Sequence, residues 1–488
     1  MIPFSAWLPD RAELDTAASA DVSNVIPAMD GFRPMPGFVE ETNAATAMPI
    51  GVISVRAQDG TPATFYGDTT KLYKLNADGV TWNDASRTAG GAYTTVAEGA
   101  WSFSQFGNDI MASNGVDATQ VFLLGSSTNF APLAGSPPVG YFTGVVRGFA
   151  VIAKLATNFN AVAWSGIEDN HTWAASPVTL ADQQVFPDGG NVTGFVGGEF
   201  GIVFQESAIQ RMVFEGPPTA FRFDKISQNL GCRLERSIAS YGDMIFFLGD
   251  DGFYMIGGGQ QLVPIGEEKV DRWVETNLDL GNKHLVRSAI DPLRSLYLMT
   301  VPISTDLNGY PETTIAYHWP SQQWTKLNIG LTGLYVSQGT KFYTVDSVPG
   351  TVDSYSITVD SDFWKGKSKP TLAGFSSAMK SGSFTGGAME ATAETKDFQL
   401  TKGRKTLLRG VRPIIEGVDT SMAVTIKGRT DMHRPYNDYG PYEVNDIGYC
   451  PVRVNERYHR AKITIPANEN WTFIRGIDDL KFSKMGYR

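Results

Sequence analysis

Residues 237–265 read SIASYGDMIFFLGDDGFYMIGGGQQLVPI, and this stretch decides the fold of the chain. Its apolar segments are separated by the turns Gly242-Asp243 and Gly249–Gly252, and glycine and aspartate are typical of tight hairpin turns. Met244–Leu248 is apolar on both faces, which is the pattern of a strand covered on both sides. The stretch therefore predicts an antiparallel meander of short strands whose second strand is buried.

Similar strand–turn–strand units recur along most of the chain, at intervals of roughly forty to fifty residues. Strand-like segments precede most of the turns, and more apolar segments follow them. A repeat of this length that is filled by strands indicates a β-propeller. Seven turns predict seven blades, with six as the alternative because a terminal strand can complete the last blade. The turns are Gln58–Gly60, Phe106–Asp109, Arg147-Gly148, Gly197–Glu199, Tyr241–Asp243, Asp291–Arg294 and Gln338-Gly339.

The chain has 488 residues, which is enough for a large ring and an appended domain. Its 51 glycines fall mostly at turns, as an all-β protein with many short strands requires. Proline residues in the first segment argue against regular pairing there. We expect four parts: an irregular lead-in over 1–50, a β-propeller over 51–365, a Gly-, Ser- and Lys-rich linker over 366–387, and a β-sandwich-like domain over 388–488.

Two local patterns support this division. Short alternating segments at 422–427 and 459–465 predict half-buried strands of a small sandwich. The best helix candidate is 267–277, where Val270 and Val274 recur at helical spacing. We expect no other substantial helix.

Charge is divided unevenly between the two ends of the chain. Residues 396–488 hold 17 Lys and Arg against 11 Asp and Glu, a net charge of +6. The preceding 395 residues hold 24 basic and 40 acidic groups, a net charge of −16. An ordinary solvated acidic surface would explain the excess, and so would an assembly whose two ends face different partners.

Motifs for chemistry are missing from the sequence. The five histidines have no metal-ligand spacing, and Gly366-Lys367-Ser368 lacks the preceding glycine of a phosphate-binding loop because Ser361 stands there. Cys232 and Cys450 are too few for a disulfide framework and are interpreted as buried free thiols. We therefore expect no catalytic, cofactor-binding or metal site, no signal peptide and no stable membrane insertion.

Two turns resemble the Asp box of sialidases, at 76–82 and 165–173. Asp boxes are structural hairpins on the rim of a propeller, and the arginine trio, tyrosine nucleophile and glutamate base of a sialidase cannot be assigned here. The alternative function is accordingly a host-recognition or glycan-binding β-propeller, including a sialidase-like one.

Arginines cluster near the C-terminal end, at Arg453, Arg457 and Arg460 with Tyr458 between them. A nucleic-acid-binding patch needs basic residues clustered on the helix or strand that contacts the nucleic acid. Glu456 lies among these arginines and lowers their net positive charge. The strand-like context fits a row of side chains at a protein–protein interface at least as well as a nucleic-acid-binding patch.

Several segments resemble the β-propeller nozzle or hub proteins of short-tailed bacteriophages, also called tail tubular or packaged-DNA stabilisation proteins. The resemblance covers both ends of the chain well and the propeller more loosely, and none of its motifs is diagnostic alone. The segments are 7–10, 24–37, 164–165, 241–247, 394–400, 411–413, 428–430, 457–460 and 471–478.

This resemblance implies a structural subunit of the virion tail, made in the bacterial host cytoplasm, and not an enzyme. It implies a homo-oligomeric ring, usually a hexamer, that retains the packaged genome and forms a channel for its ejection. The implied partners are portal-adaptor proteins, tail fibre, spike or needle proteins, and double-stranded DNA that passes without sequence preference. We expect part of the acidic excess to line the channel, because carboxylates repel the phosphate backbone within about 8 Å at physiological salt.

Overall fold

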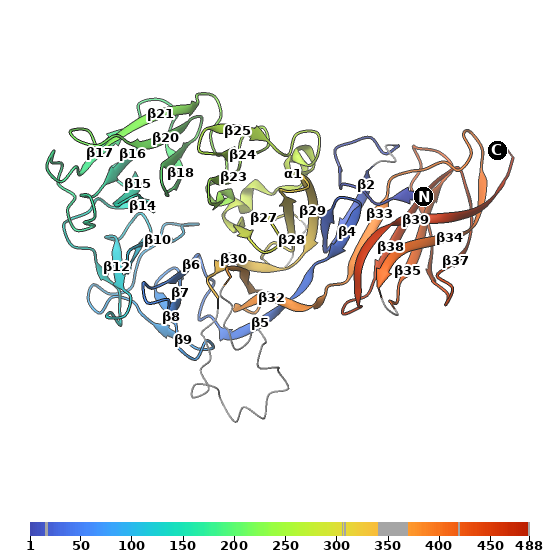
Figure 1. The fold of residues 1–488 in the computed structure, drawn as a ribbon, viewed down its shortest axis with the longest axis horizontal. Helices are drawn as coiled ribbons and strands as arrows, with labels where there is room; N and C mark the ends of the chain where they lie inside the picture. The colour runs from blue at the N-terminus through green and yellow to red at the C-terminus, as the bar shows by residue number, and fades with distance from the viewer. Residues whose placement is uncertain (15–17, 305, 307–308, 340–368, 418–419, 487–488) are drawn as a thin grey trace.

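The computed structural model describes residues 1–488 except 15–17, 305, 307–308, 340–368, 418–419 and 487–488. Seven four-stranded antiparallel sheets form a β-propeller, and two larger sheets beside it form a β-sandwich (Figure 1). The predicted fold class is confirmed, with seven blades.

The blades follow one another in chain order, each as a meander whose first strand is innermost. Their strands are β6 (Gly51–Arg56), β7 (Pro62–Gly67), β8 (Leu72–Leu75) and β9 (Trp82–Asp84); β10 (Ser102–Phe106), β11 (Asp109–Ser113), β12 (Gln120–Leu123) and β13 (Ala131–Pro132); β14 (Gly140–Val146), β15 (Phe149–Leu155), β16 (Asn158–Trp164) and β17 (Asp182–Val185); β18 (Val192–Val196), β19 (Gly201–Gln205), β20 (Ile209–Phe214) and β21 (Phe221–Ser227); β22 (Ala239–Tyr241), β23 (Met244–Leu248), β24 (Phe253–Gly257) and β25 (Gln261–Pro264); β26 (Ser288–Asp291), β27 (Leu296–Val301), β28 (Thr313–His318) and β29 (Gln323–Asn328); and β30 (Leu331–Ser337), β31 (Thr371–Ser376), β32 (Lys380–Ala388) and β5 (Pro36–Ala44).

The predicted turns follow the innermost strands. Six of them join the first strand of a blade to its second, and Gln338-Gly339 directly follows β30. The second strands are the most buried, as β23 shows with Phe246 and Phe247 at 0% exposure. Each such strand lies between two neighbouring blades, because Phe246 stacks on Tyr297 of the sixth blade and Phe247 packs against Phe204 of the fourth.

The ring closes through a strand from the other end of the chain. β32 pairs with β5, so the seventh blade takes its outermost strand from residues 36–44. The predicted linker over 366–387 is wrong for its described residues, since β31 and most of β32 lie there. Glycines in these strands permit close packing, because a Cβ on Gly382 would lie 2.0 Å from the Val39 carbonyl oxygen.

The predicted irregular lead-in over 1–50 is also wrong. It contains β1 (Ile2–Pro3), β2 (Ser19–Ser23), β3 (Val25–Ala28), β4 (Gly31–Pro34) and β5. Its prolines occupy places where a strand tolerates them, because Pro27 lies in the edge strand β3, Pro34 ends β4 and Pro36 begins β5.

The sandwich combines both ends of the chain, so the expected domain over 388–488 is incomplete without β1–β4. Its first sheet has the order β3-β4-β39-β34-β37, with β1 beside β39, and its second has the order β2-β33-β38-β35-β36. The remaining strands are β33 (Ala391–Thr395), β34 (Thr406–Gly417), β35 (Ala423–Arg429), β36 (Asn437–Glu443), β37 (Cys450–Glu456), β38 (Tyr458–Ile465) and β39 (Trp471–Lys484).

The two domains share one continuous core. Asn24 fixes the joint, because its main-chain N–H donates to the Lys326 carbonyl at 2.9 Å and its side-chain oxygen accepts the Asn328 N–H at 2.8 Å. The Thr325 hydroxyl donates to the Val25 carbonyl at 2.7 Å. One apolar cluster runs from Phe246 and Trp324 of the propeller to Ile463 of the sandwich. The sandwich is therefore attached to the outer side of the sixth blade (Figure 1).

The predicted helix is shorter than expected. α1 spans Asp271–Asn277, with Val270 at its N-cap and Val270 and Val274 buried. Asp10 accepts the main-chain N–H groups of Arg272 and Trp273, each at 2.9 Å, and so joins the N-terminal segment to this helix. Two short 3-10 helices, η1 (Glu235–Ser237) and η2 (Leu280–Leu285), lie in connections between blades. Among the described residues no helix has the length and hydropathy needed to cross a membrane.

Candidate functional site

The propeller axis contains a cavity of about 610 Å³ that all seven innermost strands line. Its polar lining is mostly neutral and includes Ser54, Gln105, Thr143 and Ser288. Among the described residues Glu235 is the one carboxylate that lines it. Hydrogen bonds between blades fix the wall, as Gln105 shows by donating to the Arg56 carbonyl at 2.6 Å. A DNA duplex is far wider than this cavity, because its major groove alone is about 12 Å wide. A single propeller is therefore not a conduit for DNA.

A second cavity, of about 650 Å³, lies at one mouth of the axis and meets the first at Phe142 and Glu235. Arg236 crosses this mouth: its guanidinium donates to the Gly99 carbonyl at 2.8 Å and to the His284 carbonyl. These partners lie in the loops that precede the second and sixth blades, so the side chain joins separate parts of the ring. Desolvation lowers the pKa of Arg236. The side chain is positioned to brace the loops rather than to react.

The two turns that resemble Asp boxes are structural hairpins. Asp78 accepts the main-chain N–H groups of Val80 and Thr81 at 2.8 and 3.0 Å. Asp169 accepts the His171 N–H at 2.8 Å and the Thr172 hydroxyl at 2.6 Å. Because these bonds occupy the carboxylates within their own turns, the resemblance does not indicate a catalytic site.

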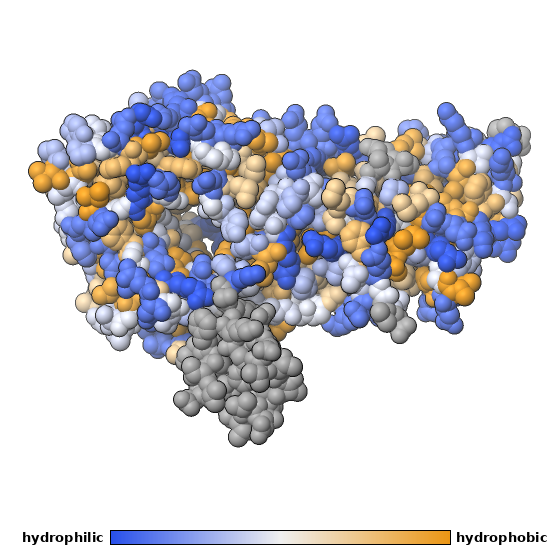
Figure 2. Space-filling view, viewed as in Figure 1, coloured by the Kyte–Doolittle hydropathy of each residue, from blue (hydrophilic) through white to orange (hydrophobic). Residues whose placement is uncertain are grey.

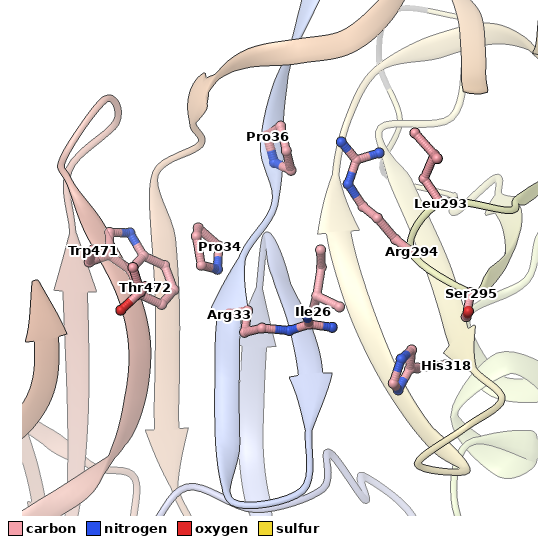
Figure 3. Close-up of a pocket in the computed structure, with 10 residues that line it drawn as sticks. All are labelled: Ile26, Arg33, Pro34, Pro36, Leu293, Arg294, Ser295, His318, Trp471 and Thr472. Atoms are coloured by element: carbon pink, nitrogen blue, oxygen red, sulfur yellow. The ribbon is translucent and has the colours of Figure 1, made fainter. Parts of the chain in front are cut away.

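A third cavity, of about 410 Å³, lies where the propeller, the β3–β4 hairpin and the sandwich meet (Figure 3). In this junction pocket the Arg33 side chain extends from β4 toward His318 at the end of β28. Arg294 comes from the β26–β27 turn, and Trp471 begins β39. The lining residues include no carboxylate; they are Ile26, Arg33, Pro34, Pro36, Leu293, Arg294, Ser295, His318, Trp471 and Thr472.

The two arginines of the junction pocket differ in their bonding. Two partners fix the Arg294 side chain. Its Nη1 lies 2.7 Å from the buried Asp291 carboxylate, and its Nη2 donates to the Phe384 carbonyl at 2.9 Å. Arg33 is exposed and has no ion pair or hydrogen bond from its side chain within the described residues. Desolvation, followed by the Arg33 charge, lowers the pKa of His318, which therefore stays neutral near pH 7. Of the charged groups that line this pocket, Arg33 is the one without a counterion among the residues that the structure describes.

Segments that carry the phage-tail resemblance meet in a buried ion network in the sandwich. The Asp397 carboxylate is 0% exposed and accepts from Arg429, from Arg460 at 2.6 Å and from the Tyr436 hydroxyl at 2.8 Å. Both guanidinium groups lie over the Tyr436 ring, at 4.3 and 4.4 Å from its centroid. Glu394, Lys427 and Glu13 extend the network. These charges satisfy one another, so their role is structural.

Three cations lie on neighbouring strands of the exposed face of the first sandwich sheet. Arg409 of β34 is in a β-bulge, Arg453 of β37 follows the outward positions of an alternating strand, and Lys481 of β39 pairs with Gly410. All three side chains are exposed, and none forms an ion pair in the part of the chain that the structure describes. We call this set the cation ladder. Neighbouring strands are about 4.8 Å apart, so these like charges repel one another.

The ladder was only partly predicted. Of the three arginines singled out from the sequence, Arg453 belongs to it, Arg460 lies in the buried ion network, and Arg457 follows β37 at the turn into β38. Arg409 and Lys481 were missed because they are remote in sequence from Arg453. The alternation of exposed and buried residues in β37 and the neighbouring strands could have shown that these side chains point outward. The order of strands in the sheet was needed to show that the three cations are neighbours.

The remaining chemistry is sparse. Cys232 and Cys450 are buried and free, as predicted, and burial raises the pKa of the Cys232 thiol to about 12. No cluster of three or more His, Cys, Asp or Glu side chains in the described ranges could hold a metal ion. Gly366-Lys367-Ser368, the segment considered for phosphate binding, lies outside the described residues.

Comparison with known proteins gives no family. No family model matches the chain, and no curated protein matches it. Among solved structures, YCF48 bound to a D1 peptide is 14% identical, with 62% of this chain and 86% of that chain covered and a TM-score of 0.34. A chain of the mitotic checkpoint complex is 8% identical, with 72% and 93% covered and a TM-score of 0.37. PorZ, a surface component of the type-IX secretion system of Porphyromonas gingivalis, is 10% identical, with 83% and 48% covered and a TM-score of 0.35. The propeller assignment depends on the strand order itself.

Proposed function

We propose that the protein is a structural subunit of a short-tailed bacteriophage tail, in the nozzle, hub or tube that retains the packaged genome and conducts it during ejection. The observation that carries the proposal is the charge of the two joined domains: residues 36–388 hold 22 basic and 33 acidic groups, whereas the sandwich residues 1–35 and 389–488 hold 19 and 18. The acidic propeller shares a core with a sandwich whose exposed sheet face carries three cations that form no ion pair within the described residues. With this charge distribution, the sandwich of one copy could bind the propeller of the next.

The cation ladder supports assembly through charge. Like charges on adjacent strands destabilise a sheet by roughly 0.2–1 kcal/mol for each pair, so their placement is explained by an acidic partner. A neighbouring copy of the propeller supplies such a surface, and so would an acidic adaptor protein. Figure 2 shows apolar residues scattered in small groups among hydrophilic ones on the face drawn, so charge rather than a large apolar patch would guide recognition there.

In this proposal the DNA channel lies between copies, because the axial cavity of one propeller is too small for a duplex. A ring of copies, six in the proposed form, would enclose a lumen to which each acidic body contributes. Carboxylates in that lumen would let the duplex slide, because the phosphate backbone finds no counterion there.

The decisive experiment is electron microscopy of phage particles labelled with an antibody against this chain. A label at the tail supports the proposal, and particles without a label contradict it. Mass measurement of the purified protein tests the ring, since a hexamer weighs six times 53.1 kDa.

A triple charge reversal, Arg409→Glu with Arg453→Glu and Lys481→Glu, tests the ladder and keeps the chain intact. We expect loss of assembly with an unchanged thermal unfolding temperature. Truncation at residue 388 would be a poorer test, because β1, β2, β3 and β4 would lose their partners. The matched control is Lys402→Glu with Arg434→Glu and Lys484→Glu, which reverses three other exposed cations of the same domain.

One observation favours the alternative function, a host-recognition or glycan-binding propeller. The cavity at the mouth of the axis combines the aromatic side chains of Trp101 and Tyr141 with polar groups such as Lys154 and Glu206, a mixture that suits a sugar. A glycan array would test it, and saturable binding that Trp101→Ala abolishes would favour this alternative.

A further inference from the structure

The junction pocket has the size of a ligand site and an unbalanced electrostatic character. Its volume of about 410 Å³ falls within the range of roughly 300–1,000 Å³ that is typical of ligand pockets. The pocket is lined by two arginines and no carboxylate, and one of the arginines, Arg33, has no partner in the described part of the chain.

Trp471 forms another part of the pocket lining, from the sandwich side. Trp471 is 3% exposed, and its indole Nε1–H has no hydrogen-bond acceptor among the described residues. A buried indole N–H usually finds an acceptor, because leaving it without one costs free energy. Protein atoms cover this Nε1 atom, so a molecule in the pocket does not reach it, and Trp471 contributes an apolar wall.

The other lining residues indicate which kind of ligand the pocket suits. Ile26, Pro34, Pro36 and Leu293 form an apolar rim, and the Leu293 side chain is 49% exposed. Arg294 is oriented by Asp291 and by the Phe384 carbonyl, so it contributes a fixed positive wall rather than a mobile one. A guanidinium group is suited to bidentate contact with a carboxylate or a phosphate.

We propose that the junction pocket binds an oxyanion, a carboxylate or phosphate group, with Arg33 as the charged donor and the fixed Arg294 beside it. Because the pocket is bounded by both domains and by the β3–β4 hairpin, a bound oxyanion would stabilise the joint between propeller and sandwich. This binding site is separate from the assembly function proposed above and does not depend on it.

The test is the thermal unfolding temperature of the full chain titrated with potassium phosphate, against potassium chloride at matched ionic strength. A ligand that binds only the folded protein raises this temperature saturably. We expect a saturable rise for the wild type and an apparent affinity at least about tenfold weaker for Arg33→Gln, the usual effect of losing a charge-assisted hydrogen bond.

The matched control is Lys402→Gln, which removes an exposed cation outside the pocket and should bind phosphate as the wild type does. A peptide with a free C-terminal carboxylate, compared with its C-terminal amide, separates the two sources of the oxyanion. Tighter binding of the acid peptide than of phosphate identifies a peptide carboxylate, and the reverse order identifies a free anion. The proposal is overturned if phosphate and the acid peptide give no saturable shift, or if Arg33→Gln binds as tightly as the wild type.

Discussion

The propeller and the sandwich bury their charges differently. In the propeller, the fully buried Asp291 carboxylate pairs with Arg294 across one turn. In the sandwich, Asp397 gathers Arg429 and Arg460 from strands that are remote in sequence. The comparison teaches that most blades follow local patterns repeated along the chain, whereas the buried charges of the sandwich depend on partners that are remote in sequence.

The largest effect is expected from breaking the propeller itself. Phe246→Asp places a carboxylate between the fifth and sixth blades, where Phe246 is 0% exposed and stacks on Tyr297 at 5.1 Å. The lost burial and the unpaired charge together should cost about 5 kcal/mol or more, which is enough to unfold the ring. Far-UV circular dichroism with urea denaturation measures the loss. Leu123→Asp, at a 41% exposed position, should be nearly neutral, and equal effects at both positions would contradict the packing described.

The next effect concerns the ion network of the sandwich. Asp397→Asn removes the charge that compensates Arg429 and Arg460, and we expect a loss of about 3–5 kcal/mol in the free energy of unfolding. The propeller counterpart, Asp291→Asn, should cost less because asparagine still accepts the turn amides of Leu293 and Arg294. Asp438→Asn, an exposed position on β36, is the control. An Asp397 variant as stable as the control would show that the network adds nothing.

Acid should weaken the sandwich through His459. Its side chain is 0% exposed, and burial lowers its pKa to about 4 despite the opposing charges of Glu456 and Asp397. The unfolded chain binds a proton below about pH 6.5 and the folded chain does not until about pH 4, so stability falls across that window, by about 3 kcal/mol in total. His459→Gln should flatten the dependence measured by urea denaturation from pH 7 to 4. An unchanged slope in the variant would assign the acid sensitivity to other groups.

The joint between the N-terminal segment and the propeller should respond to acid in the opposite direction. Desolvation raises the pKa of Asp271 to about 6, and Asp10, Asp251 and Glu267 add to the rise. The folded chain therefore binds this proton more readily than the unfolded one, and stability contributed here increases as pH falls from 7 toward 4. Asp271→Asn should raise the unfolding temperature at pH 7 and leave it unchanged at pH 4. A gain of equal size at both pH values would refute the assignment.

The smallest effect is expected at the cation ladder. Arg453→Gln removes one of three like charges and should raise the free energy of unfolding by up to about 0.5 kcal/mol while weakening assembly. Denaturation and light scattering on the same sample measure the two effects. A fall of more than about 1 kcal/mol in the free energy of unfolding would mean that the Arg453 side chain stabilises the sheet by packing on it, rather than destabilising it by charge repulsion.

The sequence allowed the propeller to be predicted because its signal is local. Turns such as Gly242-Asp243 and the apolar strand after them lie within a few residues of one another, so the pattern is visible without the fold. The prolines at 27, 34 and 36 misled the interpretation, because edge positions and strand ends become visible only when the sheet order is known. The Gly- and Ser-rich segment after residue 368 misled it for a related reason, since Gly382 is needed where Val39 passes closely.

The candidate sites were less predictable than the fold. Each joins residues that are close in space and remote in the chain: Arg33 with Trp471 in the junction pocket, and Arg409 with Lys481 in the ladder. The resemblance to tail proteins drew attention to 394–400, 428–430 and 457–460, and these segments do converge. They converge on a structural network, however, and the exposed cations lie on the other sheet.

The pairing of β32 with β5 has a consequence for biosynthesis. A ribosome makes residues 36–44 early, but their partner strand is complete only at residue 388. Until then the outermost strand of the last blade has no neighbour, and the nascent protein carries an open ring with exposed strand edges. Such edges are templates for mispairing with other chains. Crowded polysomes would therefore be the setting in which this protein is most vulnerable to aggregation, well before it meets any assembly partner.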